Sequence, residues 1–344
     1  MSEDLKLRIR EIHRQINRHY YTKILPYTLR RWLTPVVSLL RACIDVIPTR
    51  RRNLDRVLFK YDGMAGGYIS GRRMAFEQPH EILANLDGKP ALVRSDLYFD
   101  RIADYVADYV FRLKPNARSV LEVGVGEYTT LVAAVKKTGR QPERLVGLDI
   151  SWSRLRLGEK HAAEQGVRIE KSVMGNIFSL PFLNDSFDVV YTHYCIEQSP
   201  FNNEKVLGEL HRVARSHVVL MEPSYELGNS IQKKRMLIED YVRGLPRSLK
   251  RLGFKVIRHE PLPISTYQNR GAVWIIEKNA ALPGHLPTQY LACPQTLEPL
   301  EEIHRQFFCR KLGMVYPVLD GIACLQPDYA IRAAKFAYNQ QPTT

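Results

Sequence analysis

Residues 119–127 read Ser-Val-Leu-Glu-Val-Gly-Val-Gly-Glu and carry the clearest fold signal in the chain. An apolar run ends in Glu122, two places before a Gly-x-Gly turn, and a helical apolar pattern follows over residues 131–135. This order predicts a buried parallel strand, a tight turn and then a helix. Glycine suits the turn because a residue without a Cβ lets the backbone turn sharply and pass close to a ligand. Turns of this kind bind nucleotide-like molecules.

The chain beyond this turn continues the pattern. Five further apolar runs predict strands, at residues 144–149, 187–191, 217–221, 254–257 and 272–276. The first of them ends in Asp149, and a carboxylate at that strand end can accept both hydroxyls of a ribose. The last two runs have no helix between them, which predicts an antiparallel hairpin at one edge of the sheet.

Taken together, these residues resemble the class I S-adenosylmethionine-dependent methyltransferases, near the small-molecule-type branch. The resemblance implies an α/β fold with a Rossmann-like seven-stranded sheet over residues 116–282, with S-adenosyl-L-methionine as the cofactor. It implies that Asp149 holds the ribose, that Ile150 packs on the adenine and that Asn176 accepts the adenine amino group. The full set of implied cofactor-binding residues is Glu122, Gly124, Gly126, Asp149, Ile150, Asn176 and Ile177.

Two residues depart from the family pattern. Asn176 stands where the family commonly has Asp, although an amide oxygen can still accept the same hydrogen bond. Glu127 follows the second glycine of the turn, where many members have a third glycine or a small residue. These departures keep open a non-catalytic scaffold with the same fold.

A dinucleotide-binding fold is the rival interpretation of the turn. That fold needs Gly-x-Gly-x-x-Gly, and Thr129 stands at the sixth position here. The chain also lacks a second mononucleotide half that would receive a nicotinamide. The residues therefore favour the methyltransferase.

The catalytic candidates follow the strand at residues 187–191. A sulfonium methyl donor is already activated, so an enzyme mostly aligns the reactants and excludes water. Where the acceptor is a hydroxyl, a base helps to remove its proton. His193 is the first candidate because its ordinary pKa lies near neutrality, with Tyr194 and Glu197 as its neighbours; Glu222 is an alternative wall residue of the acceptor site.

The amino-terminal part of the chain is unusually basic. Residues 1–60 contain fourteen Lys or Arg and five Asp or Glu, and apolar residues recur at helical spacing from Leu5 to Tyr20. A basic amphipathic helical arm of this kind can lie on an anionic membrane, neutralise the phosphates of RNA, or pack on the protein's own core. All three interpretations stay open.

Residues 61–115 are expected to be a linker followed by a lid helix. The glycines and arginines of residues 63–73 suggest a loop with room for an anion, or a plain linker. Residues 96–113 carry a helical apolar pattern and stand where the family often has a helix that covers the cofactor.

Residues 283–330 resemble the small zinc-ribbon-like family that includes the activator subunit of tRNA methyltransferases. Cys293-Pro-Gln-Thr296, Phe308-Cys309-Arg310 and the run Tyr316-Pro-Val-Leu-Asp-Gly-Ile carry this resemblance. Thr296 replaces the second Cys of the expected Cys-Pro-x-Cys pair, so we predict a metal-free module. Residues 331–344 are a short tail.

The sequence as a whole predicts a cytoplasmic enzyme, with a peripheral position on the inner membrane surface left open. Five scattered cysteines do not suggest a disulfide framework. The leading hypothesis is methyl transfer to an oxygen or nitrogen of a metabolite, glycan or lipid-linked acceptor. A tRNA or rRNA methyltransferase is the alternative, although the Asn/Asp-Pro-Pro-Tyr/Phe clamp that holds base amines is absent at residues 191–194. Oligomeric state and pathway are not indicated.

Overall fold

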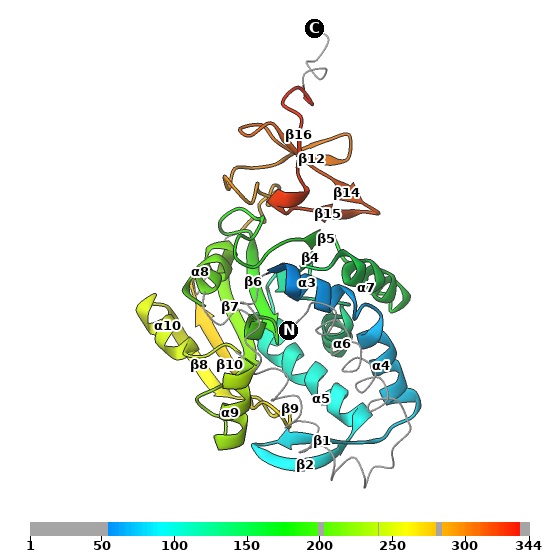
Figure 1. The fold of residues 1–344 in the computed structure, drawn as a ribbon, viewed down its shortest axis with the longest axis vertical. Coiled ribbons are helices and arrows are strands. Elements are labelled where there is room, and N and C mark those ends of the chain that lie inside the picture. The colour runs from blue at the N-terminus through cyan, green and yellow to red at the C-terminus, as the bar shows by residue number, and fades with distance from the viewer. Residues whose placement is uncertain (1–53, 199–202, 240, 280–283, 338–344) are drawn as a thin grey trace, which may run out of the picture. The chain divides into compact units, whose positions relative to one another are not determined.

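The computed structural model describes residues 54–337 apart from residues 199–202, 240 and 280–283 (Figure 1). Its centre is a nine-stranded sheet in the order β14-β15-β5-β4-β3-β6-β7-β10-β8. In chain order the strands are β3 (Ser119–Val123), β4 (Arg144–Asp149), β5 (Lys171–Met174), β6 (Phe187–His193), β7 (Ala214–Pro223), β8 (Lys255–Pro261), β10 (Gly271–Glu277), β14 (Val318–Leu319) and β15 (Ile322–Cys324). The strands from β15 to β7 pair in parallel. The expected Rossmann-like α/β sheet is confirmed.

The sheet differs from the expected seven strands at one edge. β15 pairs in parallel with β5, and β14 pairs with β15. The backbone N–H of Leu325 also donates to the carbonyl of Met174 at 2.8 Å. An edge strand presents unpaired backbone groups, and here the carboxy-terminal part of the chain satisfies them. At the other edge, β10 lies antiparallel between β7 and β8, as the late apolar runs predicted.

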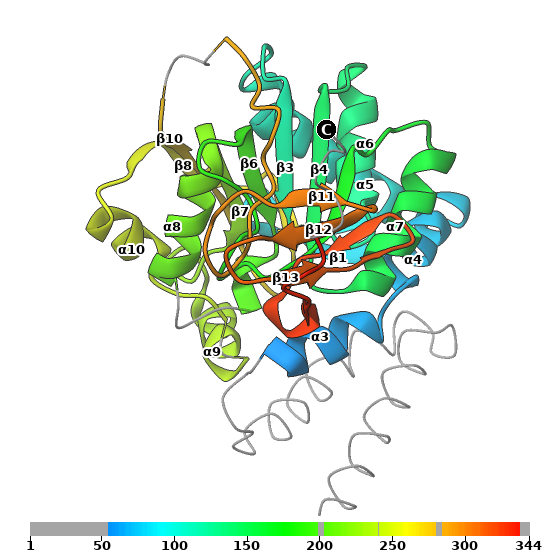
Figure 2. The same cartoon turned by 90° about the horizontal axis from the view of Figure 1, so that it is seen from above.

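Helices cover both faces of the sheet, because successive side chains of a strand point to opposite faces. Val120 packs in one buried cluster and its neighbour Leu121 in the other. The first cluster contains residues of α5 (Ser95–Val106), α6 (Thr129–Thr138) and α7 (Trp152–Glu164), and the second contains residues of α8 (Asn203–Val213) and α10 (Leu245–Arg251). Figure 2 shows α8 and α10 on the opposite side of the sheet from α5 and α6.

The segment before the first sheet strand is largely helical. α3 (Leu54–Asp62) and α4 (Gly67–Glu77) precede the hairpin of β1 (Glu81–Leu86) and β2 (Lys89–Arg94). The loop expected over residues 63–73 is therefore wrong from Gly67 onward, because the backbone there forms regular helical hydrogen bonds. The helical pattern of residues 96–113 forms α5, which continues as a π-helix over Ala107–Arg112, and its role as a lid stays a prediction.

Smaller elements complete the core. β1 also pairs with β9 (Ile264–Thr266), which gives a three-stranded sheet in the order β2-β1-β9. α9 (Ser230–Ile238) begins with a capping box between Asn229 and Gln232. A 3-10 turn, η2 (Ile196–Gln198), follows β6.

The carboxy-terminal module forms a second, four-stranded antiparallel sheet. It contains β11 (Glu301–Ile303), β12 (Gln306–Cys309), β13 (Met314–Tyr316) and β16 (Ile331–Arg332), with a 3-10 turn η3 (Pro327–Tyr329) before β16. Cys293 and Cys309 are buried in the core cluster shared with the large sheet, whereas Cys324 packs in the cluster on its other face. The described residues hold no cluster of three or more His, Cys, Asp or Glu side chains arranged for a metal ion.

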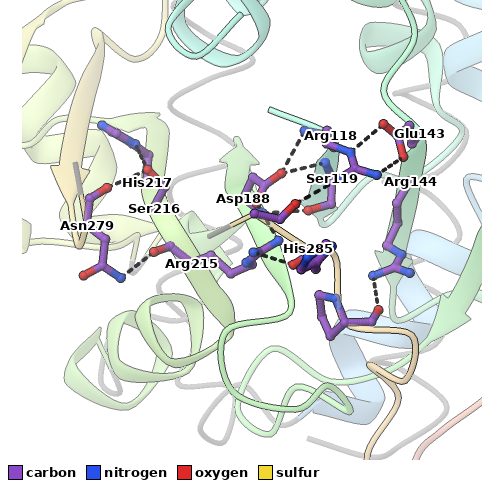
Figure 3. A network of polar contacts seen from close by, with 12 residues as sticks. Arg118, Ser119, Glu143, Arg144, Asp188, Arg215, Ser216, His217, Asn279 and His285 are labelled. Carbon is purple, nitrogen blue, oxygen red and sulfur yellow. Dashed lines mark hydrogen bonds and ion pairs between the residues drawn. The ribbon is translucent and has the colours of Figure 1, made fainter. Parts of the chain in front are cut away.

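A polar network ties the amino ends of the strands to the start of this module (Figure 3). Asp188 accepts hydrogen bonds from the backbone N–H groups of Arg118 at 2.8 Å and Ser119 at 3.1 Å, and pairs with Arg215 at 2.9 Å. Arg215 also donates to the carbonyl of His285 at 2.7 Å. The network lies at the opposite end of the strands from Glu122 and Asp149.

Two expectations fall on residues without a described structure. The basic arm of residues 1–60 is described only from Leu54 onward, and the tail only to residue 337. Among the helices that are described, none combines the length and apolarity needed to cross a membrane.

Candidate active site

The glycine turn joins β3 to α6 and needs both of its glycines. Gly124 has φ 81° and Gly126 has φ 58°, a backbone region that residues with a side chain rarely adopt. A Cβ at Gly124 would overlap the sulfur of Cys195, and a Cβ at Gly126 would overlap the guanidinium of Arg154. The turn is therefore a cradle against which other groups pack closely.

Glu122 is buried at the end of β3, directly before the turn. Its Oε2 accepts a hydrogen bond from the hydroxyl of Tyr191 at 2.6 Å. Burial raises the pKa of Glu122 to about 8, and the nearby Asp149 raises it further while Tyr191 opposes the shift. A carboxyl group with this pKa is mostly protonated at neutral pH and ionises readily when a cation approaches.

Asp149 is buried at the end of the neighbouring strand β4. One carboxylate oxygen accepts from the backbone N–H of Gly126 at 2.8 Å and the other from that of Ser151 at 2.9 Å. Burial raises the pKa of Asp149, whereas Arg154 and these backbone donors lower it. Asp149 thus ties the glycine turn to the start of α7 and keeps lone pairs available for a further donor.

Glu127, an unexpected residue at its position, holds a helix from another part of the chain. Its Oε1 accepts from the backbone N–H of Gly66 at 3.1 Å and its Oε2 from that of Ile69 at 2.8 Å. These groups lie at the amino end of α4, whose own N-cap residue is a glycine without a side-chain cap. Glu127 therefore caps α4, where its negative charge also complements the helix dipole.

Tyr128 has a left-handed backbone conformation, which residues with a side chain rarely adopt. It has φ 59°, and its side chain is fully buried. The hydroxyl bonds with that of Ser172 at 2.7 Å, and the ring fills the space beside Gly147 and Gly158. Those two glycines, which carried no signal in the sequence, make room for the ring.

Arg154 lies in the first turn of α7 and connects Glu127 and Asp149 to the helices α3 and α4. Its guanidinium lies between Glu127 (Nε to Oε1, 3.6 Å) and Asp149 (Nη1 to Oδ2, 3.9 Å). The rings of Tyr61 on α3 and Tyr68 on α4 lie 5.4 Å and 4.6 Å from it, within cation–π range. Neither Arg154 nor the two tyrosines were predicted as site residues from the sequence; an Arg five residues after Asp149 was the available signal.

The adenine-side candidates lie on two loops. Ile150 and Ile177 are both half-buried, and Ile177 packs against the core. The side-chain oxygen of Asn176 accepts the backbone N–H of Phe178 at 2.8 Å, so it retains one lone pair for a ligand. The carboxy-terminal module supports this loop, since the hydroxyl of Ser179 donates to the carbonyl of Pro294.

His193 ends β6 and contacts α5. Its Nε2 lies 2.7 Å from the hydroxyl of Tyr105 on α5, and its ring packs edge-on against Tyr194. His193 is half-buried, and the partial loss of solvent around its ring lowers its pKa to about 3, with a smaller contribution from the charge of Arg72. The imidazole is therefore neutral at physiological pH and is a weaker base than an exposed histidine.

The next residues turn sharply across the end of β7. Tyr194 has φ 53°, and the backbone N–H of Cys195 donates to the carboxylate of Glu222 at 3.0 Å. Burial raises the pKa of Glu222 to about 7, while the backbone donors oppose the shift. The carbonyl of Glu197 accepts from Val242 at 3.1 Å. The 194–197 turn thus lies directly over Glu222.

The hydrogen-bonding groups around the glycine turn fit a cofactor with a ribose and a positive charge. Two buried carboxyl groups, Glu122 and Asp149, flank the glycine turn, and the buried Nε of Arg154 has no hydrogen-bond partner. Buried polar atoms are normally hydrogen-bonded, so the Nε–H of Arg154 fits an oxygen atom of such a cofactor.

Comparison with known proteins agrees with this geometry. Residues 120–217 match the family described as "Methyltransferase domain". A demethylmenaquinone methyltransferase of Geobacillus stearothermophilus is 28% identical over 146 residues, which cover 42% of this chain and 61% of that protein. The matched segment therefore spans less than two thirds of this relative.

Two solved structures overlap more of the chain at lower identity. The crystal structure of the [4+2]-cyclase SpnF is 15% identical with a TM-score of 0.49, and covers 66% of this chain and 96% of its own. Magnesium protoporphyrin IX methyltransferase from Synechocystis PCC 6803 is 13% identical with a TM-score of 0.46, and covers 64% and 98%.

The fold and the glycine turn define a Rossmann-like domain of the methyltransferase class. Residues 120–217 are a class I S-adenosylmethionine-dependent methyltransferase domain.

Proposed function

We propose that this protein transfers the methyl group of S-adenosylmethionine to a small aromatic acceptor of hydroquinone type, whose electron-rich ring supplies the nucleophile. The observation that carries the proposal is the pair of buried carboxyl groups, Glu122 and Asp149, on either side of the Gly124–Gly126 turn. The similarity to proteins named demethylmenaquinone methyltransferase supports a small-molecule acceptor.

The residues of the glycine turn suit S-adenosylmethionine as the methyl donor. When bound, S-adenosylmethionine supplies an activated methyl group on a sulfonium, which needs alignment and exclusion of water more than activation. Glu122 would face the positively charged methionine end, where an approaching cation favours loss of its proton. Asp149 would accept ribose hydroxyls, and Ile150, Asn176 and Ile177 would surround the adenine.

The side chains at the end of β6 suit an aromatic acceptor. His193 packs against Tyr105, with ring centroids 5.8 Å apart, and against Tyr194 at 4.9 Å. Aromatic rings favour offset or edge contacts with further rings. Since the pKa of His193 is lowered to about 3, we propose that it orients the acceptor as a neutral hydrogen-bonding group. Tyr194 and Glu197 remain the other catalytic candidates.

The proposal is tested by incubating the purified chain with methyl-labelled S-adenosylmethionine and a cell extract separated into lipid, small-molecule, RNA and protein fractions. Demethylmenaquinone, chemically reduced to its hydroquinone beforehand, is added as a defined acceptor in a parallel reaction. Label in the lipid or small-molecule fraction, lost in Asp149→Asn, is the expected result. Label in RNA would replace the proposal with the RNA methyltransferase alternative. Absence of label together with absence of cofactor binding would overturn the enzyme itself and favour the scaffold.

A further inference from the structure

The guanidinium of Arg154 is buried beside the proposed ribose site without a complete set of partners. Its side chain is 9% exposed, and its Nε has no hydrogen-bond partner. The nearest carboxylate oxygens, on Glu127 and Asp149, lie at 3.6 Å and 3.9 Å. Hydrogen bonds from N–H donors to oxygen are normally 2.7–3.2 Å long. The two acids therefore neutralise the charge of Arg154 without saturating its donors.

The surroundings hold this guanidinium in place before any ligand binds. Tyr68 and Tyr61 cover it with their rings, and both belong to the helices α4 and α3. α3 is fixed in turn by Asp62, whose carboxylate accepts a hydrogen bond from the hydroxyl of Ser151 at 2.7 Å. A preorganised donor loses little conformational entropy when it binds a ligand.

Asp149 alone cannot satisfy a ribose hydroxyl completely. A carboxylate only accepts hydrogen bonds, whereas a hydroxyl carries one donor and two acceptor lone pairs. Arg154 carries only donors, and its guanidinium lies against both Asp149 and the backbone of Gly126. The two side chains therefore offer complementary groups to one hydroxyl-bearing ligand.

We propose that Arg154 is a cofactor-binding residue that recognises the ribose together with Asp149. In this arrangement the carboxylate accepts the proton of a ribose hydroxyl, and the guanidinium donates to a ribose oxygen. The inference rests on the proposed function, because it requires that the glycine turn binds an adenosyl cofactor. The opposing view is that Arg154 only braces α3 and α4 on the turn.

The test compares two ligands in three variants by calorimetry. The ligands are S-adenosylhomocysteine and its analogue without the two ribose hydroxyls, and the proteins are wild type, Arg154→Met and Asp62→Asn. Arg154→Met keeps an unbranched side chain of similar length without the charge. Because hydrogen bonds to charged groups are stronger than neutral ones, we expect Arg154→Met to reduce the preference for the ribose form about tenfold or more.

Asp62→Asn is the matched control. It weakens the contact between α3 and Ser151 without altering the charged groups around Gly126. We expect the preference for the ribose form to stay within about twofold of wild type in this control, since the site keeps both Arg154 and Asp149. Thermal unfolding of each variant establishes whether it is folded. If Arg154→Met is unfolded, Arg154→Lys takes its place, because lysine keeps the charge but lacks the planar guanidinium.

The outcomes distinguish a failure of the inference about Arg154 from a failure of the proposed function. Equal weakening of both ligands in Arg154→Met would show a bracing role and overturn the inference while leaving the proposed function intact. Failure of wild type to bind either ligand would overturn the proposed function and the inference with it. Selective loss of the ribose preference, with binding of the dideoxy analogue unchanged, would establish Arg154 as part of the ribose site.

Discussion

The carboxylate of Glu127 accepts a hydrogen bond from the backbone N–H of Ile69 at 2.8 Å, across 58 residues of chain. Its other oxygen accepts the N–H of Gly66. One side chain thus joins the glycine turn to the start of α4. The position of α4 over the turn depends on a residue that follows Gly126 directly.

Glu127→Ala should destabilise the fold. The change removes the acceptor of two N–H groups at a helix start and leaves Arg154 with one acidic neighbour fewer. Loss of a helix cap costs about 0.5–2 kcal/mol, and the unbalanced buried charge adds to it, so we expect a loss of about 2 kcal/mol or more in the free energy of unfolding. Urea denaturation measures it. Glu164→Ala, at the exposed end of α7, is the control, with an expected change within about 0.5 kcal/mol; similar losses in both variants would contradict the capping role.

Gly124→Ala should abolish cofactor binding, whereas Gly139→Ala should not. Both glycines have positive φ, 81° and 64°, so each substitution carries a backbone cost of about 1–2 kcal/mol. Only at Gly124 does the added Cβ also overlap Cys195; the space around Gly139 is open. Calorimetry with S-adenosylhomocysteine compares them. Equal affinities for the two variants would show that the turn does not form the cofactor cradle.

Leu325→Ala should destabilise the whole described core rather than the carboxy-terminal module alone. Leu325 is fully buried in the cluster that also contains residues of β3 and β6. Removing a buried Leu side chain costs about 2–5 kcal/mol, and we expect one cooperative transition at lower denaturant. Near- and far-ultraviolet circular dichroism follow this unfolding transition. The control is Leu319→Ala, because Leu319 is 52% exposed. Two separate transitions in the variant would contradict a shared core.

Much of the central sheet could be predicted from sequence because its strands are buried on both faces and give continuous apolar runs. Glu122, Gly124, Gly126 and Asp149 were found because local patterns place an acid or a turn at a strand end. The structure confirms those positions, and their roles toward a cofactor stay predictions.

Contacts between distant segments left no comparable signal. Glu127 seemed a departure from a family pattern, yet its function depends on α4, some 60 residues away. The pairing of β15 with β5 joins residues about 150 positions apart, and no local pattern states which edge a short strand will join. The low pKa of His193 likewise follows from its packing against Tyr105 on a distant segment. The sequence alone therefore suggested an ordinary base.

Cofactor binding should release a proton and strengthen as pH rises. The pKa of Glu122 is raised to about 8 by burial, so near pH 7 the ligand-free protein holds a proton that a bound cation would displace. Affinity for S-adenosylmethionine should therefore increase from pH 7 to about 8 and level off above it, where Glu122 is already ionised. Calorimetry in two buffers of different ionisation enthalpy counts the released protons. Glu122→Gln has a similar shape without a titrating group, so its affinity should vary less over this interval. An unchanged pH dependence in Glu122→Gln would assign the proton to another group, with Glu222, whose pKa is raised to about 7, as the next to be replaced.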